Sequence, residues 1–521
     1  MPQMTTVRDA TISLLRELGM TTVFGNPGST ELPMFRDFPD DFRYVLGLQE
    51  SIVMGMADGF AQATRSAALV NLHSAAGVGH SLGNLFTAYK NQTPLVVTAG
   101  QQARSILPFE PFLFAERPTE FPQPYVKWAA EPARAEDVPA AIARAWYVAM
   151  QPPCGPTFVS IPVDDWDREC EPLAARKVSA RNPGDPALLD EAAAMLSSAR
   201  SPLIVVGAGV ARDDAWDAVI ALAEKHDAPV MVAPMSARCS FPEDHPLFAG
   251  FLTAGREPIV ADLAGHDLVL VLGGPMSLYH VEAFGPHVPE GTRLVQIADN
   301  PAHVAWNPAG IGIVADTRLA IGTLLRADAP QRAAPAPLTR PGPLDGSVLS
   351  DAYLLQQIAR LRPEGAILVE EAPSSRGVLH DRLPIVMRDG FYTTASGGLG
   401  HGLPAAVGVA LGRPGERVIA LLGDGSAMYA IQGLHAAAQW KLPVTFVIVN
   451  NGRYEALHSF GRVFGMQQLV GTALPHLDFV ALAQGQGVPA TRVEKSADLD
   501  AALSKNFASH GPSLVEVIVD G

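Results

Sequence analysis

The chain contains 521 residues, of which 48% are hydrophobic and 17% charged, and its formal net charge is -15. This length exceeds what one hydrophobic core organises and predicts about three domains, at roughly 100 to 200 residues each. The net negative charge argues against a nucleic-acid partner, because phosphate binding requires clustered Lys and Arg. No apolar run approaches the roughly 18 residues of a membrane span, so we expect a compact, soluble protein without a membrane partner.

The N-terminus, MPQMTTVRDATISLLRELG, predicts an amphipathic helix that begins near Thr5 or Thr6. It lacks the apolar core of a signal peptide. The three cysteines, Cys154, Cys170 and Cys239, are an odd number without metal-ligand spacing, which favours reduced thiols that serve in packing. These features together predict a cytoplasmic location.

Two stretches rich in Pro, Ala and polar residues, at 171–186 and 327–347, divide the chain into three parts. Within each part, short runs of Val, Ile and Leu alternate with helical patterns, as in 202–234. Such alternation predicts parallel sheets covered by helices. We therefore expect an α/β protein of three doubly wound parallel-sheet domains, with ranges 1–175, 187–327 and 347–521.

Three polar residues of the first part lie at the ends of predicted strands or at helix starts. Ser29, in Asn26-Pro27-Gly28-Ser29, precedes ELPMF, where it would also suit a helix N-cap. Glu50 ends the strand-like YVLGLQ and opens the helical SIVMGMADGFAQA, a position that the helix dipole by itself favours for a carboxylate. His73 follows the strand AALVNL, where a lone histidine is most often structural. Structural and catalytic roles are both open for all three.

The first and last parts echo each other. In the first, AALVNL leads into HSAAG, a helix and the strand PLVVTAG; in the last, RVIALL leads into GDGSA, a helix and PVTFVIVNN. The interval from His73 to Pro94 is 21 positions and that from Gly423 to Pro443 is 20. The echo indicates two related domains, although any two β-α-β units share some of this similarity.

The middle part contains GAGVAR at 207–212, where a dinucleotide-binding fingerprint would require Gly or Ala in the last position. Arg212 breaks that pattern, so we expect a structural turn. His280 follows the strand-like VLVLGGPM of this part and, alone, would also be taken as structural.

Ser396-Gly397-Gly398-Leu399-Gly400 is a run of small residues that carries one aliphatic side chain. Small residues let a backbone approach a planar ligand closely, and Leu399 can wedge between two rings. The alternative is a glycine-rich strand-to-helix loop in which Leu399 belongs to the core.

The strongest signal is Gly423-Asp424-Gly425-Ser426 after a buried strand, followed by Asn450-Asn451 at the end of the next strand. The glycines allow close approach to a diphosphate, while Ser426 and the following helix N-terminus supply donors. Asp424 offers a hard carboxylate to a divalent cation, and the neighbouring strand brings Asn451 to the same edge. An all-oxygen shell of this kind suits Mg²⁺ or Ca²⁺. A lone GDG is usually only a turn, but the spaced asparagines favour a metal-bridged diphosphate site.

This pattern resembles the cofactor motif of thiamine-diphosphate enzymes, and the resemblance covers essentially the whole chain. The echoing parts then correspond to that family's pyrimidine-binding and diphosphate-binding domains, which flank a middle domain. Within the family the chain is most similar to the benzoylformate decarboxylases. That likeness is carried by FGNPGSTELP, LQES, NLHSAAG, TAGQQAR, IPVDDWD, the LYH of 278–280 and SGGLGHGLPAA.

The resemblance implies a role for each candidate residue. Glu50 would contact the cofactor's aminopyrimidine, Leu399 would enforce its bent conformation, and Ser29 would hydrogen-bond the substrate carboxylate. His73 and His280 would transfer protons in different steps, since an imidazole titrates close to neutrality. The implied metal ligands are Asp424, Asn451 and the main-chain oxygen of Arg453. The implied contacts to thiamine diphosphate are Asn26, Pro27, Gly28, Ser374, Gly397, Leu399, Gly423, Asp424, Gly425, Ser426, Asn451 and Tyr454.

The chain departs from the family pattern beside the cofactor. Arg453 and Glu455 flank Tyr454 where smaller residues are expected, and Thr393 takes the place of a large aromatic residue. The segment after Tyr454 supplies further residues for an aromatic substrate pocket, although ordinary packing would explain them almost as well: Ala456, Leu457 and Phe460.

The function implied is the thiamine-diphosphate- and Mg²⁺-dependent, non-oxidative decarboxylation of an aryl 2-oxo acid, with benzoylformate giving benzaldehyde and CO₂. One alternative is a carboligase or acetolactate-synthase-like enzyme that uses the same cofactor; another is a cofactor-free binding protein that retains the fold. The absence of the adjacent His-His pair of pyruvate decarboxylases disfavours pyruvate. The family also implies a homodimer or a dimer of dimers, because the two halves of each site come from different subunits.

Overall fold

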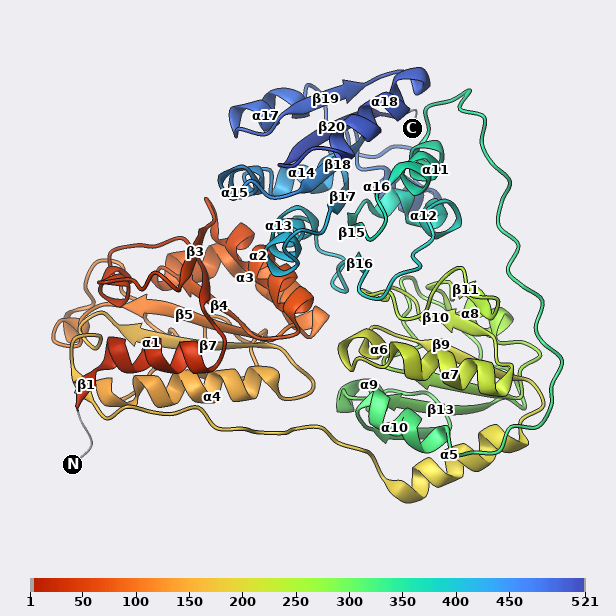
Figure 1. Ribbon diagram of the computed structural model, residues 1–521, viewed down its shortest axis with the longest axis horizontal. Helices are drawn as coiled ribbons and strands as arrows, with labels where there is room; N and C mark the ends of the chain where they lie inside the picture. The colour runs from red at the N-terminus through yellow and green to blue at the C-terminus, as the bar shows by residue number, and fades with distance from the viewer. Residues whose placement is uncertain (1–3, 520–521) are drawn as a thin grey trace. The chain divides into compact units, whose positions relative to one another are not determined.

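The apolar runs of the sequence form three six-stranded sheets in a computed structural model, which describes residues 4–519 (Figure 1). Strand pairs such as β4–β5, β9–β12 and β17–β18 run parallel, and helices cover the sheets. The predicted fold class, three parallel-sheet α/β domains, is confirmed. Contacts group the chain into two compact units. One holds the first sheet and the third sheet except β16, in Met1–Val178, Leu344–Gly377 and Ser396–Gly521; the other holds the middle sheet and β16, in Ser179–Pro343 and Val378–Ala395.

The first sheet has the strand order β3-β2-β4-β5-β7-β6. Helix α1 begins next to Thr6, whose hydroxyl accepts a hydrogen bond from the Asp9 amide at 3.1 Å, so the predicted helix start is confirmed. Helices α1 and α4 lie side by side on one face (Figure 1), and α2 and α3 pack against each other and the sheet. The elements are α1 Val7–Glu17, β2 Thr22–Gly25, β3 Arg43–Leu46, α2 Glu50–Thr64, β4 Ala68–Leu72, α3 Ser74–Asn91, β5 Leu95–Gln101, β6 Ala129–Ala130, α4 Val138–Met150 and β7 Pro156–Pro162, with the short pair β1 Thr5–Thr6 and β8 Glu169–Cys170.

The third sheet repeats this topology with the order β16-β15-β17-β18-β20-β19. Numbered within each sheet, both orders read 2-1-3-4-6-5, so the echo in the sequence corresponds to two sheets of one design. Helix α13 of this part packs along α2 of the first part, within the same unit. The elements are α11 Asp351–Leu361, β15 Ile367–Glu371, α12 Arg376–Arg382, β16 Phe391–Tyr392, α13 Gly402–Gly412, β17 Val418–Gly423, α14 Asp424–Tyr429, α15 Gly433–Gln439, β18 Val444–Asn450, α16 Glu455–Val463, α17 Phe479–Gly485, β19 Ala490–Val493, α18 Ser496–Phe507 and β20 Ser513–Ile518.

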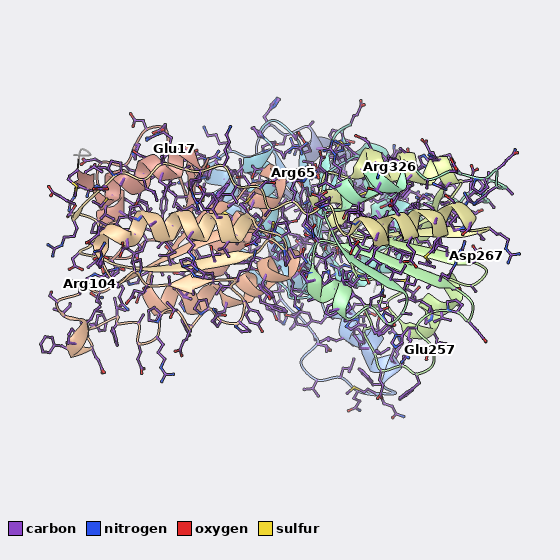
Figure 2. All side chains as sticks on the ribbon, turned by 90° about the horizontal axis from the view of Figure 1, so that it is seen from below. Glu17, Arg65, Arg104, Glu257, Asp267 and Arg326 are labelled. Carbon is purple, nitrogen blue, oxygen red and sulfur yellow. The ribbon has the colours of Figure 1, made fainter. Side chains whose placement is uncertain are left out.

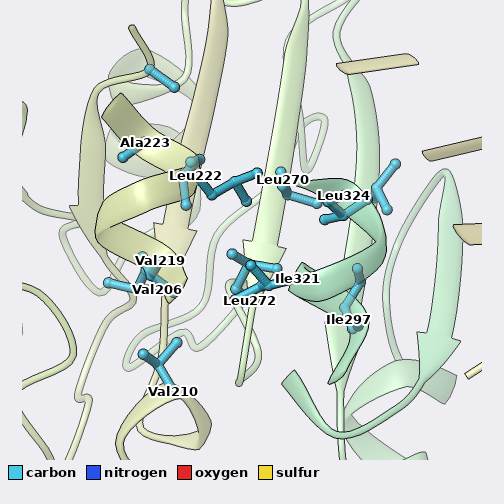
Figure 3. Packing of buried hydrophobic residues seen from close by; sticks show 14 of the residues in the cluster. Val206, Val210, Val219, Leu222, Ala223, Leu270, Leu272, Ile297, Ile321 and Leu324 are labelled. Carbon is cyan, nitrogen blue, oxygen red and sulfur yellow. The ribbon is translucent and has the colours of Figure 1, made fainter. Parts of the chain in front are cut away.

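The middle sheet has a different order, β11-β10-β9-β12-β13-β14, which is 3-2-1-4-5-6 within the sheet. Its core forms where β9, β12 and β13 meet α7 and α10, with Val206, Leu270 and Ile297 facing Leu222 and Ile321 (Figure 3). The elements are α5 Pro186–Ser198, β9 Pro202–Val206, α6 Gly209–Arg212, α7 Trp216–His226, β10 Val230–Val232, β11 Phe248–Phe251, α8 Arg256–Asp262, β12 Leu268–Leu272, β13 Arg293–Ala298, α9 Pro301–Ala305, β14 Ile311–Val314 and α10 Thr317–Leu324.

The GAGVAR segment is accounted for by packing inside the middle sheet. A Cβ added to Gly207 or Gly209 would lie 2.8 or 2.5 Å from the carbonyl oxygen of Gly273. Only glycine permits the turn after β9 to approach the turn after β12 so closely. Arg212 lies 3.6 Å from the Asp299 carboxylate, at the end of the short helix α6. The turn expected over the whole segment is therefore confined to its first two residues, and the other four are helical.

Residues 378–395 lie inside the predicted range 347–521 but cluster with the middle sheet. A buried ion pair between Arg238 and Asp389 at 2.5 Å, and a contact of 2.8 Å between Glu243 and His380, hold this segment there. Pairings across such long sequence separations carry no local signal that a composition-based boundary could use.

The surface is charged, and the cysteines form no disulfide in the described part of the chain. Charged side chains of both signs, such as Glu17, Arg65 and Arg326, lie on the outside of the ribbon (Figure 2). Within residues 4–519, no helix combines the length and apolarity needed to cross a membrane. None of the three cysteines, all of which lie within residues 4–519, forms a disulfide, and burial raises the pKa of Cys239 well above its usual value.

Candidate active site

Glu50 opens helix α2 but does not cap it. The preceding Gln49 is the cap, and its side-chain oxygen accepts hydrogen bonds from the amides of Ser51 at 2.7 Å and Ile52 at 3.3 Å. The Glu50 side chain is buried, and it accepts from Asn26 Nδ2 at 3.1 Å and lies 3.2 Å from His80 Nδ1. A carboxylate has about four acceptor positions, so Glu50 retains capacity for a further donor. Glu50 also lies in the first turn of α2, where the helix dipole favours a carboxylate, so its place at the helix start and its contacts with Asn26 and His80 occur together.

The loop after β2 carries Asn26, Pro27, Gly28 and Ser29. Ser29 is exposed, and the short 3-10 helix that follows, Leu32–Phe35, begins after Glu31. The alternative that Ser29 caps a helix is therefore wrong, because the chain turns once more before it becomes helical. The Ser29 hydroxyl is instead presented to solvent at the sheet edge, beside the loop residues predicted to contact the cofactor.

His73 lies at the carboxyl end of β4, directly before α3. Its ring packs on the loop backbone so closely that a Cβ at Gly28 would lie 2.2 Å from Nδ1. Nδ1 is 2.9 Å from the carboxylate of Glu31, a buried residue that lies within the FGNPGSTELP motif but was given no role in the sequence analysis. A signal was nevertheless present, because Glu31 follows a strand in the same loop as the predicted Ser29.

The loop 396–401 is held by buried charges. Glu371, at the end of β15, accepts the main-chain amides of Gly400 at 2.6 Å and His401 at 2.7 Å, and also that of Gly402. Burial raises the pKa of Glu371. These bonds set the path of the loop that presents Gly397 and Leu399. Leu399 is only half-buried, so it does not belong to the core and its side chain can meet a ligand.

A second set of contacts ties the same loop to α2 and α3. His401 pairs with Asp58 of α2, and both side chains are fully buried. Burial alone would raise the pKa of Asp58, but the charge and hydrogen bond of His401 lower it; the same pair raises the pKa of His401 against the effect of burial. Asn84 of α3 donates to the Gly400 oxygen at 3.1 Å, and Thr87 contacts Ser396 at 2.9 Å. Neither Asp58 nor His401 was among the predicted site residues.

The predicted metal ligands come together where β17 and β18 end. Asp424 begins α14, and its two oxygens accept the amides of Gly425 at 2.7 Å and Gly452 at 2.8 Å. Asn451 follows β18, and its side-chain oxygen accepts the Arg453 amide at 3.1 Å. Burial raises the pKa of Asp424, so a cation at this carboxylate would offset the cost of its charge.

The donor set fits a divalent cation beside a diphosphate. No cluster of three or more His, Cys, Asp or Glu side chains with metal-binding geometry occurs among residues 4–519. The ligands predicted here include only one carboxylate, and hard cations accept amide and main-chain oxygens equally well. Gly425 is also needed for packing, since a Cβ there would lie 2.3 Å from the Tyr454 ring.

The two departures around Tyr454 pair with each other. Arg453 Nε donates to Glu455 Oε2 at 2.6 Å, and Arg462 lies 3.5 Å from the same carboxylate. The large residues are thus mutually neutralised rather than left as isolated charges. On α16, Leu457 is exposed, Ala456 and Phe460 are half-buried, and the Phe460 ring stacks on that of Phe464 at 6.4 Å between centroids.

The remaining predicted residues are Ser374, His280 and Thr393. Ser374 is exposed on a 3-10 turn, Pro373–Ser375, after β15. His280 is exposed on the loop that follows β12 in the second unit. Thr393, also in that unit, is buried, and its amide donates to the Ala237 oxygen at 3.0 Å.

Comparison with known proteins gives matches along the entire chain. Residues 5–123 match the N-terminal TPP binding domain of thiamine pyrophosphate enzymes, residues 189–324 the central domain and residues 377–517 the C-terminal TPP binding domain. The chain is 43% identical to benzoylformate decarboxylase of Pseudomonas aeruginosa, with 99% of each chain covered. It is 30% identical to a putative acetolactate synthase large subunit of Mycobacterium tuberculosis, with 98% of each covered.

Solved structures of decarboxylases are also similar to this chain over nearly its full length. The crystal structure of benzoylformate decarboxylase from Polynucleobacter necessarius is 40% identical with a TM-score of 0.96, covering 99% of this chain and 98% of that one. A thiamine diphosphate-dependent 4-hydroxybenzoylformate decarboxylase of Rhodococcus jostii is 41% identical with a TM-score of 0.96, covering 99% of both chains.

Proposed function

Because this chain belongs to the thiamine-diphosphate-dependent 2-keto-acid decarboxylases, of the benzoylformate decarboxylase type, we propose that it decarboxylates an aryl 2-oxo acid, with benzoylformate giving benzaldehyde and CO₂. The observation that carries the choice of substrate is the 43% identity over the full length to a benzoylformate decarboxylase. The 4-hydroxybenzoylformate enzyme among the solved structures extends the proposal to ring-hydroxylated substrates.

The cofactor would be held in two halves. Asp424, Asn451 and the main-chain oxygen of Arg453 would bind Mg²⁺, and the diphosphate would lie against the same turn and Ser374. The aminopyrimidine would lie between Asn26, Pro27, Gly28 and Glu50 on one side and Gly397, Leu399 and Tyr454 on the other. When bound, thiamine diphosphate supplies the nucleophilic carbon and the electron sink that decarboxylation requires.

The protein's own groups would orient the substrate and move protons. Glu50 would hold a proton against the aminopyrimidine, which suits its buried carboxylate with spare acceptor capacity. Ser29 would donate to the substrate carboxylate, and His73 and His280 would exchange protons with the reacting carbon and its oxygen. The apolar face of α16 would receive the aryl ring through Ala456, Leu457 and Phe460, with Thr393 as a further pocket residue.

We also propose that the active unit is at least a homodimer, either a dimer or a dimer of dimers. Glu50 and the Asp424 turn of each active site would come from different copies of the chain. This would make subunit association and cofactor retention one equilibrium.

The proposal is tested by measuring CO₂ and aldehyde release with thiamine diphosphate and Mg²⁺ across benzoylformate, 4-hydroxybenzoylformate, a branched 2-oxo acid and pyruvate. We expect kcat/KM for the aryl acids to exceed that for pyruvate by at least about 10²-fold, because the pocket would bury the ring. A preference for pyruvate with acetolactate as the main product would refute the proposal in favour of the carboligase alternative.

A further inference from the structure

The Glu31 carboxylate is the centre of a hydrogen-bond network at the edge of the first sheet. Its side chain is 1% exposed. It accepts the amide of Gly28 at 2.8 Å and that of Gly100 at 3.0 Å, the hydroxyl of Thr30 at 2.5 Å, and its Oε2 lies 2.9 Å from His73 Nδ1. One buried side chain thus joins the loop after β2, the end of β4 and the end of β5.

The hydrogen-bond donors around the Glu31 carboxylate indicate which nitrogen of His73 carries the hydrogen. Main-chain amides can only donate, and a carboxylate offers about four acceptor positions, so the two amides, the Thr30 hydroxyl and one imidazole N–H fill it. The Thr30 hydroxyl also lies 3.1 Å from His73 Nδ1, but its single hydrogen is directed to Glu31 at the shorter distance of 2.5 Å. A carboxylate has no hydrogen to give, so the hydrogen between Glu31 and His73 lies on Nδ1. A neutral His73 with a hydrogen on Nδ1 has a bare Nε2, which can accept a proton.

The ring is also fixed in position. A Cβ at Gly28 would lie 2.2 Å from Nδ1 and 2.3 Å from Cγ of His73, so the imidazole rests directly on the backbone that Glu31 holds. On the other side, Ser74 has a φ of +44° and donates from Oγ to the Leu113 oxygen at 2.7 Å, which sets the backbone after the histidine. Rotation of the ring would break the contact with Glu31 and leave a buried carboxylate short of a donor, which is unfavourable because the carboxylate has no water to replace the lost bond.

We propose that Glu31 is the positioning residue of the active site: it fixes His73 as the Nδ1–H tautomer and leaves Nε2 bare for proton transfer. The inference rests on the proposed role of His73 in decarboxylation, and Glu31 acts only through that histidine. It extends the proposed function by identifying Glu31 as the group that makes Nε2 the atom through which His73 accepts and returns a proton.

The test compares Glu31→Gln, Glu31→Asp and a control, Asp165→Asn. Asp165 is another buried carboxylate of the same part of the chain, but it pairs with Arg104 at 2.7 Å. In Glu31→Gln the amide NH₂ can donate to Nδ1, which moves the imidazole hydrogen to Nε2. The Nε2 of a neutral imidazole is the atom that diethyl pyrocarbonate modifies, so the modification rate of His73, read by peptide mass spectrometry on the cofactor-free protein, reports the tautomer. The exposed His510 serves as the internal standard.

We expect the His73 modification rate relative to His510 to fall at least about 10-fold in Glu31→Gln, to recover in Glu31→Asp, and to be unchanged in Asp165→Asn. In the cofactor-loaded enzyme, kcat of Glu31→Gln should fall about 10² to 10⁴-fold, the usual contribution of proton transfer by a positioned histidine, with a smaller change in KM. An unchanged His73 rate in a folded Glu31→Gln protein would overturn the proposal.

If Glu31→Gln does not fold, ¹⁵N spectra of the histidine-labelled wild-type protein show which nitrogen of His73 carries the hydrogen. The His73→Gln variant is used to assign the signal. A hydrogen on Nδ1 supports the proposal, and one on Nε2 overturns it. Neither chemical readout uses substrate. A wild type that releases no aldehyde from any aryl acid would therefore refute the proposed function and leave the tautomer assignment standing, whereas an active wild type with the wrong tautomer would refute only the role of Glu31.

Discussion

Replacing Asp58 by Ala should destabilise the protein strongly, because it removes one partner of a fully buried ion pair. Asp58 is 0% and His401 1% exposed, so solvent cannot screen the loss. Asp58 also accepts from Asn91 Nδ2 at 2.8 Å and Gln62 Nε2 at 3.1 Å, and both amides would lose their acceptor. Breaking a buried pair by removing one partner costs about 3–5 kcal/mol.

The matched control is Asp41→Ala, which removes an exposed ion pair with Arg16 of similar length, 2.6 Å, in which the side chains are 45% and 52% exposed. Water and salt screen an exposed pair of this kind, so this variant should melt close to the wild type. Thermal melts followed by circular dichroism, at one protein concentration and without cofactor, give the comparison. Equal changes in Tm for the two variants would refute the reasoning from burial.

The effect should also depend on pH. The pair raises the pKa of His401 above its usual 6.5, so its stabilisation is complete below that value and is lost as pH rises through the raised pKa. It lowers the pKa of Asp58 below its usual 3.8, so stabilisation is also lost as pH falls through the lowered pKa. The Tm difference between wild type and Asp58→Ala should therefore be largest between about pH 4 and 6.5 and should shrink in alkaline buffer.

Other variants test the separate parts of the site. Glu50→Gln should retain cofactor, measured by equilibrium dialysis, but slow deuterium exchange at C2 of the bound thiazolium; unchanged exchange would remove its assigned role. Asp424→Ala should lose the cofactor and Mg²⁺ together, and full retention of both would refute the metal site. Chelation and dialysis of the wild type should abolish activity, which thiamine diphosphate plus Mg²⁺ should restore. Gly28→Ala should lower kcat by about 10²-fold or more, because the added Cβ displaces the His73 ring that lies 2.2 Å away; wild-type turnover would show that the ring is not fixed there. Size-exclusion chromatography of active enzyme should give a dimer or larger, and an active monomer would contradict the shared site.

The local sequence was enough to determine the elements and the motif turns. Runs of Val, Ile and Leu at strand length, separated by helical patterns, predicted three parallel sheets, and the matching intervals after His73 and Gly423 predicted the two sheets that share one strand order. The location of Asp424 and Asn451 at one sheet edge could be predicted because they follow adjacent strands, and the carboxyl ends of parallel neighbours meet at one edge.

Only the tertiary structure showed which charges are buried together. Glu31 meets His73 across 42 positions, and His401 meets Asp58 across 343. Arg453 and Glu455, which appeared in the sequence as two unrelated departures, neutralise each other at 2.6 Å. A buried polar residue needs a hydrogen-bonding or charged partner, and that partner can lie far away in the sequence. The hydrophobic periodicity that predicts strands and helices does not indicate which distant residue it is.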